Sequence, residues 1–308
     1  MSTRAMGPMA GLGWLTRAIN VGRNGPGAVF GGAALMTVVV LAAVFGGVAA
    51  QIALAATMGD GLTGMMIGTA VMSVLVIVIM AMMMVGFLRV LDNVESGSGA
   101  RAMDVFGGFG DFTTSLRTIG LMVMLAVLQN VIMIAVLMTF AGGFVQWYLQ
   151  MLQSSMAGGG DPAMLNQLPA GMGVASVAML VIGLVFYGVQ AIALGQVVLR
   201  GRGVFSALGD GVVGAFKNLL PLLVFVIAAI VAMILVSIAV ILLAMLIGLV
   251  AKFVGAWLAV VLAVPLYIAG MLAMYVVMFG AMYHLWRDVC GGGAGAVTGP
   301  VVNDGVAA

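Results

Sequence analysis

The chain has 308 residues, of which 64% are hydrophobic and 6% are charged, with a formal net charge of +2. About a quarter of the residues of a typical soluble domain are charged, so this composition excludes a water-soluble fold and requires lipid to cover most of the surface. The small net charge and the lack of a basic patch interleaved with aromatic residues predict no nucleic-acid partner.

Six apolar runs without Asp, Glu, Lys or Arg follow one another along the chain. They lie near residues 28–54, 62–88, 118–142, 172–198, 219–249 and 254–285. Crossing a bilayer takes about 20 apolar residues in a helix, and none of the runs shows the alternation of a membrane β-strand. The sequence therefore predicts an all-α fold, a compact polytopic transmembrane helical bundle of six spans. The first run is roughly twice as long as the apolar region of a signal peptide, so it is interpreted as a retained span.

The segments outside these runs divide the chain further. Residues 1–26 are predicted to form an N-terminal tail with an interfacial helix, residues 27–289 the six-helix membrane domain, and residues 290–308 a disordered tail. The connection 143–170 begins with an amphipathic stretch that predicts a continuation of the third helix into the membrane interface. The run Gly158–Pro162 is expected to break that helix.

Short amphipathic stretches precede the first, third and fifth spans. Their apolar residues recur every three or four positions, which is typical of helices that lie in the membrane interface with the apolar face in lipid. These residues are Trp14, Leu15 and Ile19; Phe106, Phe109, Phe112 and Leu116; and Phe205, Leu208, Val212 and Phe216. One interpretation is a unit of interfacial helix plus helical hairpin used three times. The other is that any six-span chain needs amphipathic connections on one side.

The basic residues predict the orientation. Ten of the eleven lie before the first span, in the second and fourth connections, or after the sixth span: Arg4, Arg17, Arg23, Arg89, Arg101, Arg117, Arg200, Arg202, Lys217 and Arg287. Only Lys252 lies in a connection of the opposite side. Because basic residues are retained in the cytoplasm, both ends of the chain are expected to be cytoplasmic.

Three amides near the middle of the membrane are the candidate polar contacts. Gln129 and Asn130 lie in the third span, and Gln190 lies in the second half of the fourth. One interpretation is that these amides form hydrogen bonds between helices, each of which contributes roughly 0.6–2 kcal/mol to helix association. The alternative is a polar path for a neutral solute.

Chemistry-bearing residues are few. No span carries a carboxylate, and the one histidine, His284, lies in the aromatic cluster Tyr283–Arg287 and is interpreted as an interface anchor. Rows of methionine in the second and sixth spans suit Cu(I), but among 28 methionines they are interpreted as core filler. We therefore expect no catalytic, cofactor-binding or metal-ligating residues and no cofactor, and the chain is predicted not to be an enzyme.

Several short motifs carry a family resemblance. They are Gly11–Leu15 leading to Arg23 and Pro26; Arg89–Asp92 followed by Asp104–Phe106; Phe205–Ala207 through Lys217 and Asn218; and Trp286–Asp288. In this order, over residues 10–289, the chain resembles an uncharacterised family of six-pass proteobacterial inner-membrane proteins, a domain of unknown function. That family is loosely similar to the membrane part of glycerophosphodiester phosphodiesterases. The resemblance implies a bacterial inner-membrane location and supplies no activity or catalytic residue.

The sequence does not define a biochemical role. The leading hypothesis is a non-enzymatic scaffold or accessory membrane subunit whose partners are membrane lipids and either another membrane protein or a second copy of the chain. The alternative is a transporter-like conduit for a small neutral or lipid-like solute. A third hypothesis is a membrane-embedded enzyme that needs a catalytic group from a partner.

Overall fold

The computed structural model describes residues 3–57, 61–156 and 168–291, and every regular element in these ranges is helical. Six of the helices are long and apolar enough to cross a membrane. They are α2 (Pro26–Thr57), α3 (Gly61–Glu95), α5 (Phe112–Phe140), α7 (Met172–Arg200), α9 (Leu219–Val254) and α10 (Ala256–Cys290). The chain is thus an all-α, multi-pass membrane protein in contact with lipid, as predicted.

The shorter helices lie before the first span and in the connections between the spans. Four of them are α1 (Ala10–Ile19), η1 (Ala102–Phe106), α4 (Gly107–Gly110) and α8 (Val204–Lys217). The helix predicted at the start of the connection 143–170 is α6 (Phe144–Met156). The predicted break at Gly158–Pro162 and the predicted tail beyond Gly291 lie outside the described residues.

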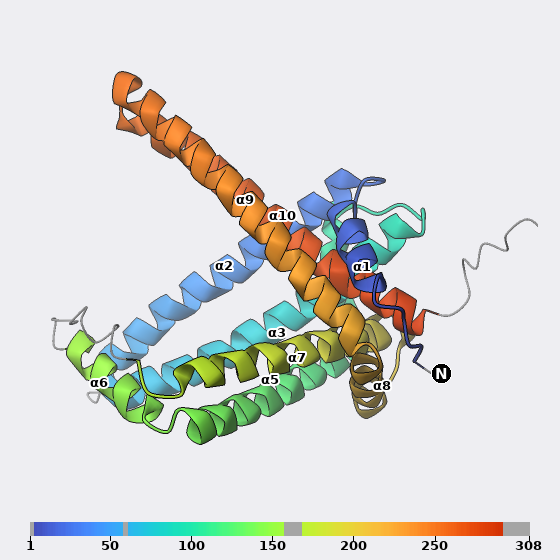
Figure 1. Cartoon of the computed structure of the whole chain (residues 1–308), viewed down its shortest axis with the longest axis horizontal. Coiled ribbons are helices and arrows are strands. Elements are labelled where there is room, and N and C mark those ends of the chain that lie inside the picture. The colour runs from blue at the N-terminus through green and yellow to red at the C-terminus, as the bar shows by residue number, and fades with distance from the viewer. Residues whose placement is uncertain (1–2, 58–60, 157–167, 292–308) are drawn as a thin grey trace, which may run out of the picture.

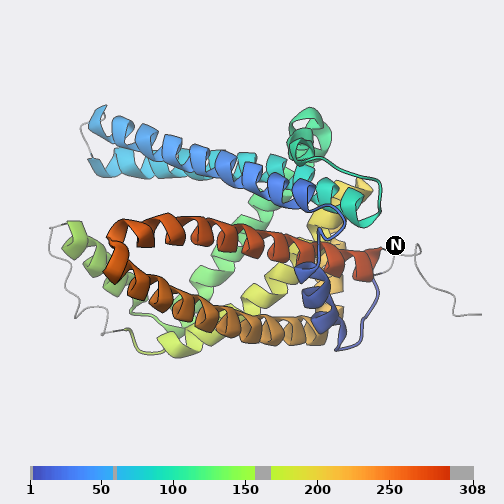
Figure 2. The same cartoon turned by 90° about the horizontal axis from the view of Figure 1, so that it is seen from above.

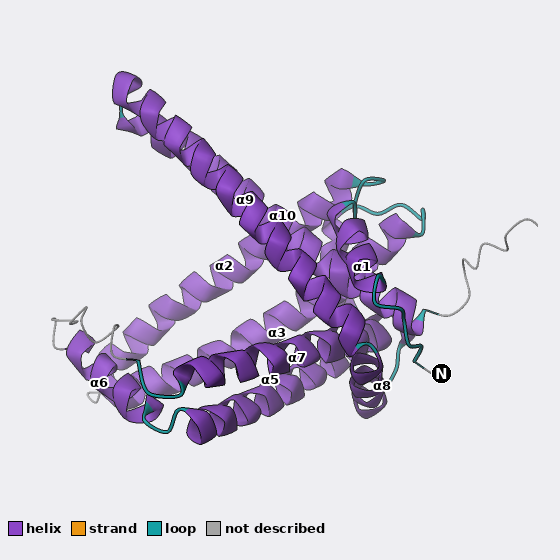
Figure 3. Ribbon diagram, in the orientation of Figure 1, coloured by secondary structure: helices purple, strands orange, loops and turns teal. Residues whose placement is uncertain are grey.

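The spans form three hairpins, α2–α3, α5–α7 and α9–α10, that are joined at one end of the molecule. The N-terminus, α1 and α8 lie at this end, whereas α6 and the turn between α9 and α10 lie at the opposite end (Figures 1 and 2). The first is called the charged end, because Arg17, Arg89 and Asp288 are among its residues, and the second the far end. Figure 3 shows the loops that join the helices at the charged end.

The protein core lies at the charged end, where α3, α7 and α10 contact one another. The largest fully buried side chains, including Trp14, Phe87, Phe279 and Tyr283, all belong to this region. Toward the far end the α9–α10 hairpin separates from the other two (Figure 1), and α9 has no buried residue beyond Phe225. The compactness expected from the sequence is therefore limited to one end. Lipid tails are as apolar as these side chains, so the far halves gain little by packing together.

Small residues let the short helices dock on the spans. A Cβ atom at Gly86 of α3 would overlap the Val105 carbonyl of η1, and one at Gly280 of α10 would lie 3.3 Å from Ala18 Cα of α1. In the same way, a Cβ atom at Gly188 of α7 would lie 3.1 Å from the Cβ of Ala215 in α8. η1 and α8 thus contact the spans that precede them, α3 and α7, and α1 contacts the last span, α10. The unit of interfacial helix plus hairpin stays a prediction, because amphipathic connections without a repeat would dock in the same way.

Candidate functional site at the charged end

Asp288, near the end of α10, holds α1 in place. The indole Nε1 of Trp14 donates a hydrogen bond to Asp288 Oδ2 at 2.9 Å. The guanidinium of Arg17 forms a two-pronged ion pair with the same carboxylate, in which Nη1 lies 3.1 Å from Oδ1 and Nη2 contacts Oδ2. Arginine and carboxylate match in this geometry, which fixes orientation as well as distance. Trp14 is 0% exposed, so this contact belongs to the interior and α1 is anchored by a buried indole.

A second hydrogen bond joins α10 to α3. The hydroxyl of Tyr283 donates to Asp92 Oδ1 at 2.8 Å, and the guanidinium carbon of Arg287 lies 5.9 Å from the centre of the Tyr283 ring. Tyr283 is 2% exposed, and its ring contributes to the core while its hydroxyl reaches the carboxylate of the neighbouring helix. Tyrosine suits such a position because it combines a large apolar body with a polar tip.

His284 lies inside the protein, between α10 and α3. It is 2% exposed, and neither ring nitrogen has a hydrogen-bond partner among the described residues. Its Nε2 lies 4.0 Å from Glu95 Oε2 of α3. The prediction of an interface anchor for His284 is therefore wrong. The aromatic neighbours Tyr283 and Trp286, which suggested a belt at the membrane surface, instead pack in the core of the charged end.

A third polar contact lies between α7 and α8. Asp210 of α8 accepts a hydrogen bond from Gln196 Nε2 of α7 at 3.0 Å and pairs with Arg202 Nη2 at 3.1 Å. On the other side of α7, Gly195 gives room to the Trp286 ring, which a Cβ atom at this position would overlap. The guanidinium carbon of Arg200 lies 5.9 Å from the Trp286 ring centre. α7 is thereby tied both to α8 and to α10.

The corner between α3 and α5 holds Asp111, a carboxylate whose pKa is lowered by its partners. Arg89 Nη2 lies 2.6 Å from Asp111 Oδ2, and the backbone N–H of Thr114 donates to Asp111 Oδ1 at 3.1 Å. The hydrogen bond from Arg89 and then that from Thr114 hold the pKa of Asp111 below its usual value, at about 2. Asp111 therefore stays ionised at neutral pH, as an N-cap of α5 and a partner for α3.

Together these contacts form a polar ring at the charged end. Asp92, Asp111, Asp210 and Asp288 each accept a hydrogen bond from a side chain or backbone group of another element. A carboxylate engaged in this way serves as a bridge between helices, and in this ring the bridges connect the three hairpins with α1 and α8. The polar ring therefore attaches the helices of the charged end to one another and fixes their orientation.

The amides predicted as the polar site are not brought together by hydrogen bonds. Gln129 and Asn130 are exposed on α5, and Asn130 Nδ2 donates to the Ala126 carbonyl of its own helix at 2.8 Å. Gln190 is half-buried on α7. Helix-to-helix contact through an amide occurs instead in the α2–α3 hairpin, where Gln51 Nε2 donates to Thr69 Oγ1 at 2.8 Å.

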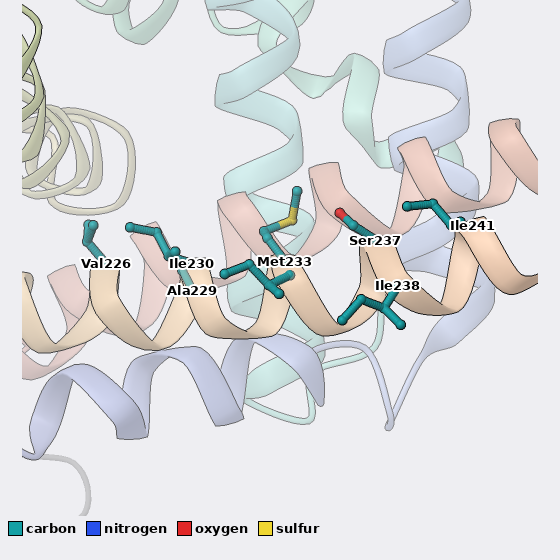
Figure 4. Close-up of a pocket in the computed structure, with 8 residues that line it drawn as sticks. Val226, Ala229, Ile230, Met233, Ser237, Ile238 and Ile241 are labelled. Carbon is teal, nitrogen blue, oxygen red and sulfur yellow. The ribbon is translucent and has the colours of Figure 1, made fainter. Parts of the chain in front are cut away.

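A long apolar groove follows α9 inside the membrane region. Figure 4 shows the side chains that line it, and all eight come from α9, between Val226 and Ile241. Ser237 supplies the one hydroxyl, and no lining side chain is titratable. Since a single helix lines the groove, it is open to the hydrocarbon of the membrane. It offers surface for apolar contact and no group for acid–base chemistry.

Sequence reasoning missed the polar ring. Asp92 and Asp288 were noted only within the motifs that carry the family resemblance, and Glu95 and Asp210 were given no role as contacts between helices. No spacing in the sequence indicates these pairs, because Tyr283 and Asp92 are 191 positions apart and Trp14 and Asp288 are 274 positions apart.

Comparisons of this chain with protein-family models, with curated proteins and with solved structures find no match.

Proposed function

We propose that this chain is a non-enzymatic scaffold or accessory subunit that binds other membrane helices along its splayed hairpins. The uncovered face of α9 carries the proposal. Beyond Phe225 none of its described residues is buried, and side chains such as Leu235 (63% exposed) and Met245 (67% exposed) are left uncovered by the rest of the chain. Helices in membranes associate by close van der Waals packing, and α9 offers the part of its length beyond Phe225 for such contact.

The closed charged end favours a scaffold over the conduit for a neutral or lipid-like solute. Fully buried large side chains, among them Trp14, Phe87 and Tyr283, fill the region where the hairpins meet. Protein interiors of this kind are close-packed, so a solute would have no passage between the hairpins at this end. The polar ring described above would also have to open during each transport event.

The membrane and the orientation belong to the same proposal. We assign the chain to a bacterial inner membrane with both ends in the cytoplasm. The family resemblance in the sequence supports the bacterial inner membrane, and the charge distribution supports the orientation. In the structure the ten basic residues of one side gather at the charged end, and Lys252 lies at the far end, in the last turn of α9.

Photo-crosslinking within the membrane tests the scaffold role. A benzophenone amino acid at position 237, in the groove of α9, is expected to form a crosslink of defined mass to another polypeptide in native membranes. The same amino acid at position 222 is the matched control, because Leu222 lies on the same helix and is 0% exposed. It should crosslink only within the chain. Lipid adducts alone at position 237 would contradict the proposal.

Solute flux in liposomes separates the scaffold from the conduit. Purified protein in sealed liposomes is expected to leave the osmotic swelling rate in glycerol at that of protein-free liposomes. A swelling rate that rises with protein content, and falls again when Asn130 and Gln190 are replaced by Leu, would favour the conduit and overturn the scaffold assignment.

A further inference from the structure

The helix α8 has two opposed faces of unusual composition. Four small buried residues face the protein: Ala207, Gly211, Gly214 and Ala215. Small size is required there, because a Cβ atom at Gly211 would lie 2.8 Å from the Val189 carbonyl oxygen of α7. A surface helix normally turns its large apolar residues toward the core. On α8 the small residues take that place.

The large apolar residues of α8 face outward. Phe205 is 82% exposed and Phe216 is 57% exposed, and Val212 and Val213 between them are also exposed. Phe205 and Phe216 are eleven residues apart, which is close to three turns of an α-helix, so they lie on one stripe. The helix crosses the ends of α5 and α7 at the charged end (Figure 1), and the residues of its outer stripe are exposed.

Exposed cations border this stripe at both ends. Lys217 ends α8 and donates to the Thr3 carbonyl at 3.2 Å, and Arg117 of α5 donates to the Gly201 carbonyl at 2.9 Å, shortly before α8 begins. Both side chains carry further donors beyond these bonds. The one carboxylate on α8, Asp210, is paired with Arg202. The surface therefore combines an apolar stripe with net positive charge at its margins.

We propose that α8, together with Arg117, is a binding surface for anionic phospholipids. Phe205 and Phe216 enter the boundary between headgroups and acyl chains, and Arg117 and Lys217 pair with the lipid phosphates. Basic amphipathic helices bind membranes by this combination of apolar burial and attraction to anionic lipid. Lipid contact as such follows from the spans, and the inference adds a preference for anionic headgroups at one defined surface.

Quenching by brominated lipids tests this preference at the site itself. The reporter is Phe205→Trp in a Trp147→Phe, Trp257→Phe background, in which the remaining Trp14 and Trp286 are buried. The protein is reconstituted in phosphatidylcholine bilayers with phosphatidylglycerol or phosphatidylcholine brominated near the glycerol end of the acyl chain. Each cation near an anionic lipid is worth about fivefold in binding. We therefore expect brominated phosphatidylglycerol to associate with this site at least about fivefold more strongly than brominated phosphatidylcholine.

Matched variants make the result decisive. Phe140→Trp in the same background reports on the far end, where Phe140 is 45% exposed and residues 118–199 include no basic residue, and it should show little preference. Arg117→Gln with Lys217→Gln should abolish the preference at position 205, whereas Lys252→Gln should leave it intact. The double variant must keep the thermal stability of the unsubstituted reporter in pure phosphatidylcholine, and if it does not, Lys217→Gln alone is used. Equal quenching by both lipids, a preference that survives loss of the cations, or no quenching at all because a protein covers α8 would each overturn the proposal.

Discussion

At the scale of single residues, Gly86 shows how closely η1 approaches α3. Any side chain at this position would overlap the backbone carbonyl of Val105, which is 0% exposed and cannot move without shifting η1. We expect Gly86→Ala to lower the free energy of unfolding by about 1–3 kcal/mol, the usual cost of overpacking. The measurement is reversible unfolding in mixed micelles.

The control for this substitution is Gly120→Ala on α5, where a Cβ atom would have no neighbour within 4 Å. Alanine forms helices better than glycine, so this variant should be neutral or slightly more stable. Equal destabilisation by both substitutions would mean that the close approach of η1 to α3 is incorrect.

Asp111 makes part of the stability depend on pH. Its pKa is lowered from 3.8 to about 2 by Arg89 and Thr114, so its ionised form favours the folded protein. The contribution is fully present above about pH 4 and is lost as the pH falls from there toward 2. Asp111→Asn keeps an N-cap for α5 and removes the charge. The stability difference between wild type and variant should therefore be largest at neutral pH and shrink toward pH 2, with a small amplitude because the pair is about one-third exposed. A difference independent of pH would contradict the role assigned to the charge.

At the scale of secondary-structure elements, the attachment of α1 depends on one carboxylate. Asp288→Ala removes the ion pair to Arg17 and leaves the buried Nε1 of Trp14 without an acceptor, which costs about 1–3 kcal/mol. Hydrogen exchange should therefore accelerate in residues 10–19. It should stay unchanged in α8, which is held through Asp210 and Gly211. Acceleration in both helices would indicate general unfolding rather than release of α1.

Most helices could be predicted from the sequence, because the length of each apolar run and its lack of charged residues define a span. A run such as 219–249 has no alternative to a span in a chain this apolar, and the amphipathic stretch around Trp147 predicted α6. What an apolar face contacts was harder to predict. The faces of Phe112 and Phe205 are exposed as expected for interfacial residues, whereas Trp14 is buried against α10. Periodicity identifies an apolar face, but lipid and protein are both apolar partners for it.

The polar ring was beyond sequence reasoning for a related reason. Tyr283 and Asp92 are 191 positions apart, and their hydrogen bond depends on how α10 leans on α3. The predicted polar site at Gln129, Asn130 and Gln190 rested on polarity and depth alone. Neither property says which helix an amide faces. In the structure Asn130 bonds within its own helix, while Gln51 and Gln196 make the contacts between helices.

At the scale of the whole molecule, uneven packing predicts uneven motion. The hairpins share buried contacts at the charged end and few at the far end, where α9 is uncovered. Regions with few buried contacts open at low free-energy cost. In nanodiscs, pulsed EPR distances between spin labels at 57 and 253, both at the far end, should therefore be broadly distributed. Labels at 23 and 205, both at the charged end, should give a narrow distribution. Equally narrow distributions for both pairs would show that the splayed arrangement is rigid.

The distribution of basic residues between the two ends predicts the orientation of the whole molecule in the membrane. Cysteines introduced as Arg23→Cys and Lys252→Cys, each in a Cys290→Ala background, lie at opposite ends of the molecule and both positions are exposed. With both ends of the chain in the cytoplasm, a membrane-impermeant maleimide added to intact cells should label position 252 and leave position 23 unlabelled until the membrane is permeabilised. This orientation is expected because it moves only the single cation of the far end across the bilayer. The opposite orientation would require the ten cations of the charged end to cross. Labelling of position 23 alone in intact cells would reverse the orientation, and labelling of both positions from outside would contradict the even number of spans.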